Sequence, residues 1–88
     1  MDSRDELMVL VSVRRKLASG EAQRLRESLG LSIAEVAHGY GFWPSAWAGW
    51  ERAEYSPNLR SARRIAQALT DLQRLADAAV IEQIQASA

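Results

Sequence analysis

The fold of this chain is decided by residues 30–53, which read GLSIAEVAHGYGFWPSAWAGWERA. Ser32 and Glu35 have the spacing of a capping box, in which two side chains satisfy the free amides at the start of a helix. This short helix is expected to end near Gly41. Pro44 suits the first position of a second helix, because its φ is fixed and it has no N–H to leave unsatisfied. Two short helices joined by a glycine-containing turn are typical of a helix-turn-helix.

Over roughly residues 20 to 70 the chain resembles the Cro and lambda-repressor-like helix-turn-helix family, also called the xenobiotic-response-element family. The matching residues are Arg26, Gly30-Leu31-Ser32, Val36-Ala37, Gly41, Trp50-Glu51-Arg52-Ala53, Pro57 and Ile65-Ala66-Gln67-Ala68-Leu69. The resemblance implies an all-α fold, a small bundle of five to six helices that contains a helix-turn-helix. It also implies a structural ion pair between Arg26 and Glu51, and insertion of the helix around residues 44–52 into the major groove of double-stranded DNA.

Residues expected to contact DNA follow from the same resemblance. Phosphates would meet Ser32, Arg52 and the start of the helix after Pro57, where free amides and the helix dipole favour an anion. Trp43 could stack or wedge at a base step, or anchor a protein partner. The full set is Ser32, Trp43, Ser45, Ala46, Gly49, Arg52, Asn58, Arg60 and Arg63.

The outer positions of the second helix are poor in side chains that read bases. They hold Pro44, Ser45, Ala46 and Gly49, whereas direct readout in the major groove depends largely on Arg, Asn or Gln. Direct base readout is therefore predicted to be weak, with groove shape supplying much of the specificity. Two functions remain open: a phage-repressor-like transcriptional regulator that binds DNA, or a protein-interaction module, antirepressor-like or antitoxin-like, that has lost base readout.

Length and composition restrict the other classes of protein. The 88 residues form one small domain, divided by prediction into an N-terminal extension helix (1–19), a repressor-like core (20–70) and a C-terminal helix (71–88). The chain has no cysteine and a single histidine, His38. With this inventory the sequence contains no catalytic constellation, cofactor motif or metal-ligand spacing. Neither an enzyme nor a small-molecule substrate is therefore expected. No apolar run approaches the ~20 residues of a membrane span, and a cytoplasmic protein is expected.

The net charge of zero conceals an uneven distribution. Residues 14–64 contain nine basic and five acidic side chains, a net charge of +4 that the two ends of the chain balance. A basic middle could present a positive face to a phosphate backbone, although a solvated surface has a similar composition.

The segments outside the core suggest self-association. Ser3 to Glu6 has a capping-box pattern, and the helix that it opens is expected to reach Ala18. From Leu7 to Val13 this segment is apolar on nearly every side, and its β-branched residues would also suit an edge strand. A homodimer through Leu7 to Val13, through the C-terminal helix, or through both is expected, since a domain of this size buries only about 60–65% of its unfolded surface.

Three further helices are expected, one before residues 30–53 and two after them. One is expected from Glu21 to Leu29 and one from Asn58 to Leu69, after which Thr70-Asp71 is predicted to cap a last helix that ends near Ala86. Among the aromatic residues, Phe42, Trp47 and Trp50 are expected in the core.

Overall fold

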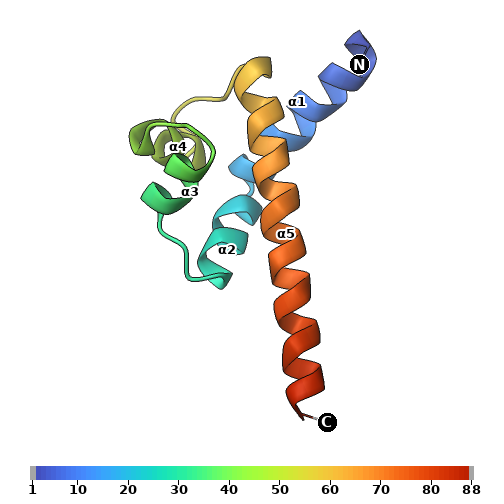
Figure 1. Cartoon of the computed structure of the whole chain (residues 1–88). Coiled ribbons are helices and arrows are strands. Elements are labelled where there is room, and N and C mark those ends of the chain that lie inside the picture. Colours follow the sequence, from blue (N-terminus) through green and yellow to red (C-terminus); the bar gives the residue numbers. More distant parts are fainter. Residues whose placement is uncertain (1, 88) are drawn as a thin grey trace.

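The computed structural model describes residues 2–87 and contains five helices (Figure 1). They are α1 (Ser3–Ala18), α2 (Glu21–Ser28), α3 (Ile33–Gly39), α4 (Pro44–Glu51) and α5 (Leu59–Ser87). No strand occurs between residues 2 and 87, so the predicted all-α bundle is confirmed and the apolar segment of α1 is helical. Within the same residues, no helix combines the length and apolarity that crossing a membrane requires.

The long helix α5 is the spine of the molecule. Figure 1 shows α1 and α2 against the first half of α5, with α3 and α4 together on one side, while the C-terminal part of α5 extends beyond the other helices. The molecule measures 46 × 29 × 22 Å. Every helix contributes to one core, whose buried apolar residues are Val13, Leu17, Ala22, Val36, Ala37, Phe42, Trp47, Trp50, Ala62, Ile65, Ala68, Leu69 and Leu72.

The predicted start of α3 is confirmed. The Ser32 hydroxyl accepts a hydrogen bond from the Glu35 amide at 3.0 Å, and the Glu35 carboxylate accepts one from the Ser32 amide at 2.9 Å. In the turn after α3, Gly41 has a φ of +75°, a value that favours glycine. The Arg64 guanidinium donates to the backbone carbonyls of Tyr40 and Gly41 and lies 4.4 Å from the centre of the Phe42 ring, which fixes this turn to α5.

The predicted break at Thr70-Asp71 is wrong, because α5 continues through it as one helix of 29 residues. The division of the domain between residues 70 and 71 fails with it. Asp71 does not cap a new helix: its carboxylate accepts hydrogen bonds from the Tyr40 hydroxyl at 2.6 Å and from the Gln67 side chain at 2.9 Å. Burial, aided by this bond, raises the pKa of Tyr40 to about 12, and the bond lowers the pKa of Asp71.

The other predicted helix boundaries, in α1, α2 and α5, lie within one residue of the observed ones. The N-cap of α1 is Asp2, whose carboxylate accepts from the Asp5 amide at 2.9 Å, so the predicted capping box from Ser3 to Glu6 is wrong by one residue. Helix α2 ends at Ser28, one residue before Leu29. The start of α5 is capped by Asn58, whose side-chain oxygen accepts from the Ser61 amide at 2.9 Å.

Candidate nucleic-acid interface

A buried ion pair sets the position of α4. Arg26 donates through Nε and Nη2 to the two carboxylate oxygens of Glu51, at 2.7 and 2.8 Å, and through Nη1 to the Leu31 carbonyl at 2.8 Å. The Trp47 indole N–H donates to the same carboxylate at 2.7 Å. Arg26 is 7% exposed and Glu51 is 8% exposed. The bond to Glu51 outweighs burial and raises the pKa of Arg26. The predicted structural pair is confirmed, and it ties α2 and the start of α3 to the end of α4.

An aromatic cluster holds the inner face of α4. The ring centres of Phe42 and Trp50 lie 4.9 Å apart at 88°, and Trp47 lies 6.1 Å from each of them. Edge-to-face contacts of this kind stabilise a core beyond their buried area. All three rings are buried, as predicted. Because this face is fully used in packing, the face of α4 around Ser45 and Arg52 points away from the core, and both residues are exposed.

Tyr55 covers part of that outer face. A Cβ added to Gly49 would overlap the Tyr55 ring, and the Tyr55 hydroxyl donates to the Ser45 carbonyl at 3.0 Å. Gly49 is therefore buried, and Ala46 is partly buried against the core. Their predicted exposure on the outer face of α4 is wrong, because Tyr55 takes the place of a side chain at position 49 and Ala46 packs against the core.

Tyr55 is the residue of this surface that sequence reasoning missed. Tyr55 is 49% exposed, so it forms part of the surface around α4. The available signal was Gly49, since glycine inside a helix costs about 1 kcal/mol relative to alanine and often marks a close approach of another group.

Trp43 stands at the start of α4 with its ring in solvent. It occupies the N-cap position without a side-chain capping bond and is 80% exposed. Trp43 and Tyr55 thus add two accessible aromatic rings to a helix surface that has few polar side chains.

Some of the residues predicted to contact phosphates already have partners within the structure. Arg52 pairs with Glu54 at 2.8 Å and Arg63 pairs with Glu6, whereas Arg60 forms no ion pair within residues 2–87. Exposed pairs contribute only about 0–1 kcal/mol, so a phosphate could replace Glu54 at little cost. Asn58 and Ser32 are exposed but already cap α5 and α3.

Comparison of the chain with models of known protein families, with curated proteins and with solved structures finds no match.

Proposed function

We propose that this chain is a DNA-binding transcriptional regulator of the lambda-repressor-like kind, acting in the cytoplasm, and that α4 enters the major groove. The observation that carries the proposal is the mounting of α4. Its inner face is fixed by the buried Arg26–Glu51 pair and the aromatic cluster, while Ser45 and Arg52 on its outer face remain exposed. Helix-turn-helix proteins use a second helix, which follows the first after a short turn and is fixed to it by packing, to reach base edges. Helices α3 and α4 have this arrangement.

The side chains of this surface suit backbone contacts better than base reading. Arg52 and Arg60 would neutralise phosphates, and the Ser45 hydroxyl is the one short polar group directed outward from α4. Trp43 offers an apolar ring that could wedge at a base step, which would bend the duplex and make specificity depend on DNA deformability.

One observation favours a second candidate, a protein-interaction module. Trp43 and Tyr55 are both exposed beside α4, and tryptophan and tyrosine are enriched at the hot spots of protein interfaces. Pairing of Arg52 and Arg63 with carboxylates also lowers the positive charge available to DNA.

A fluorescence-polarisation titration against mixed-sequence duplex DNA at about 50 mM and about 200 mM salt separates the two. The regulator should bind more weakly at high salt, and Arg52→Ala or Arg60→Ala should each reduce the slope of log K against log[salt] by about 1. Arg74→Ala removes the same charge from a distant, exposed position on α5 and should leave the slope unchanged. Absence of binding at low salt would contradict the proposal and favour the protein-interaction module.

A further inference from the structure

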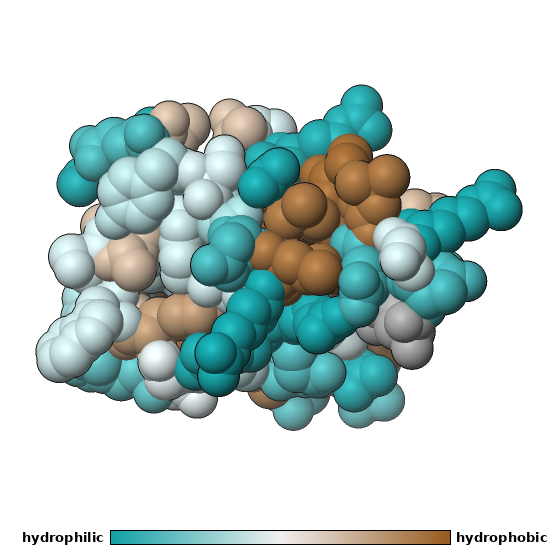
Figure 2. Space-filling model, turned by 90° about the horizontal axis from the view of Figure 1, so that it is seen from above, coloured by the Kyte–Doolittle hydropathy of each residue, from teal (hydrophilic) through white to brown (hydrophobic). Residues whose placement is uncertain are grey.

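Two apolar surfaces of the molecule are left without a partner. On α1, Leu7, Met8 and Val11 are between 45 and 64% exposed. At the other end of the molecule, the C-terminal part of α5 that follows Arg74, residues 75–87, is here called the α5 tail; its Val80, Ile81 and Ile84 are between 54 and 64% exposed. Figure 2 shows a hydrophobic patch, bordered by hydrophilic residues, on the upper face near α1.

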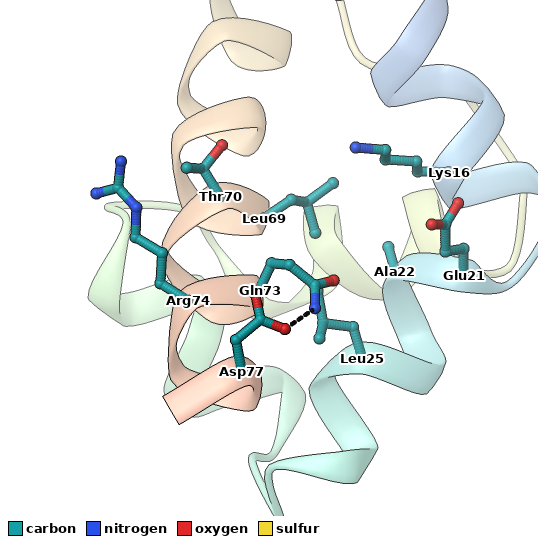
Figure 3. A pocket seen from close by; sticks show the side chains of 9 residues that line it. All are labelled: Lys16, Glu21, Ala22, Leu25, Leu69, Thr70, Gln73, Arg74 and Asp77. Atoms are coloured by element: carbon teal, nitrogen blue, oxygen red, sulfur yellow. Dashed lines mark hydrogen bonds between the residues drawn. The ribbon is translucent and has the colours of Figure 1, made fainter. Parts of the chain in front are cut away.

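The exposed residues of α1 border a groove. A hollow of about 580 Å³ lies along α1, a second of about 350 Å³ lies between α1 and α5, and a third of about 260 Å³ lies between α5 and the junction of α1 with α2 (Figure 3). Lys16 lines all three, so they adjoin one another. We call them together the α1–α5 groove; its apolar end lies beside Met8.

The groove and the α5 tail lie on one continuous face of α5. Ala66, Thr70, Gln73 and Asp77 line the groove, and Val80 and Ile84 follow them at the same alternating spacing of four and three residues. Residues with this spacing share one side of a helix. This face therefore runs from a groove at one end to an apolar helix surface at the other.

We infer that this face binds a second copy of the chain, with the two α5 helices antiparallel, so that Val80 and Ile84 of each tail enter the α1–α5 groove of the other copy. In Figure 1 α1 lies beside the start of α5 and the tail lies at the opposite end. When the two α5 helices are antiparallel, each tail therefore lies beside α1 of the other copy. A two-fold axis then relates the two copies, so the second tail meets the other groove in the same way as the first.

The area available supports a reciprocal contact. A large aliphatic side chain that is half exposed can bury roughly 50 Å² more. The six exposed apolar side chains named for the two surfaces then supply about 600 Å² of apolar area over two copies. Since roughly 60% of a typical interface is apolar, this corresponds to about 1,000 Å² of total interface area. Pairing of the two tails alone would supply about half of that area, which is in the range of non-specific contacts.

The charges of the two surfaces are also complementary. The α5 tail contains Asp77 and Glu82 and no basic residue. The groove is lined by three basic residues (Arg15, Lys16 and Arg74) and two acidic ones (Glu21 and Asp77), a net charge of +1. None of these six residues forms an ion pair within residues 2–87. A tail with a net charge of −2 against a groove with a net charge of +1 favours this orientation over the pairing of two acidic tails.

Sedimentation equilibrium tests the inference, since a dimer has twice the 9.8 kDa mass of the chain. Ile84→Asp on the tail and Met8→Asp in the groove should each raise the dissociation constant by roughly tenfold or more, because each places an unpaired charge in the interface. Ala86→Asp adds the same charge to the opposite side of the tail and should leave the dimer intact. Far-UV circular dichroism of each variant checks that the helices are retained.

Crosslinking then tests the orientation, because the chain has no cysteine of its own. The variant carrying both Met8→Cys and Ile84→Cys should form a disulfide-linked dimer under mild oxidation, whereas the single variants should not. A wild-type protein that remains monomeric at all concentrations would overturn the inference. So would a disulfide-linked dimer of the Ile84→Cys variant alone, since it would show that the tails pair with each other. This test does not involve α4, so its result is independent of DNA binding.

Discussion

Replacing Arg26 by methionine tests whether the buried ion pair holds the bundle together. The substitution keeps most of the side-chain volume but removes both hydrogen bonds to Glu51 and the bond to the Leu31 carbonyl. The Glu51 side chain is 3% exposed, and it would keep only the Trp47 indole N–H as a partner. A carboxylate that is neither hydrated nor neutralised would then remain in the core.

The expected loss of stability is large for a domain of this size. Removing one partner of a buried ion pair costs about 3–5 kcal/mol, whereas a chain of 88 residues is expected to have a total free energy of unfolding of about 4–13 kcal/mol. Arg26→Met should therefore remove a large fraction of the stability. Adding Glu51→Gln to Arg26→Met should recover more than half of the loss, because the amide oxygen still accepts from Trp47 and no buried charge remains.

Urea unfolding followed by circular dichroism gives these free energies. Arg52→Met is the matched control, since it removes an arginine from an exposed pair with Glu54, and it should change the free energy of unfolding by about 1 kcal/mol or less. If Arg26→Met lost no more stability than Arg52→Met, or if the double variant were no more stable than Arg26→Met, the structural role given to the buried pair would be refuted.

Three further predictions concern single contacts. Gly49→Ala should destabilise the fold by about 1–3 kcal/mol by displacing the Tyr55 ring, and the same change should become stabilising when measured by thermal unfolding in a Tyr55→Ala background. The bond between Tyr40 and Asp71 should add stability that is lost as pH falls below 3.8 and as pH rises from 10 toward about 12. Urea unfolding across pH should show that Tyr40→Phe lacks the high-pH dependence and has a weaker low-pH dependence, because Gln67 and Arg74 still lower the pKa of Asp71. Ser32→Ala should cost about 1 kcal/mol by removing a helix cap, and an unchanged unfolding midpoint would contradict this.

The local signals in residues 30–53 predicted the structure well because each acts over a few residues. A capping box needs only Ser32 and Glu35, and Pro44 marks the start of α4 by its own geometry. The pairing of Arg26 with Glu51 was also predicted, although it joins two helices, because the resemblance to a family supplied a contact that spacing alone does not show.

The errors at Asp71 and Gly49 came from contacts with groups outside the helix that contains each residue. Asp71 was interpreted as a helix cap because its carboxylate can serve as one, but Tyr40 lies close enough in the fold to use it. The position of Gly49 in α4 predicts that it lies at the surface; a glycine there signals the close approach of another group, but the local pattern does not identify that group as Tyr55. Both outcomes depend on tertiary packing, which outweighs local preference.

The contrast between exposed Trp43 and buried Trp47 and Trp50 gives the protein an intrinsic fluorescence reporter. Iodide, which collides with fluorophores in water, should quench Trp43 selectively, leaving a blue-shifted emission from the two core indoles. Loss of iodide access without a change in the core emission would signal that something has covered the start of α4, whereas a red shift of the core emission would signal unfolding. One optical measurement can therefore distinguish occupation of the candidate interface from loss of the fold, whichever class of partner binds there.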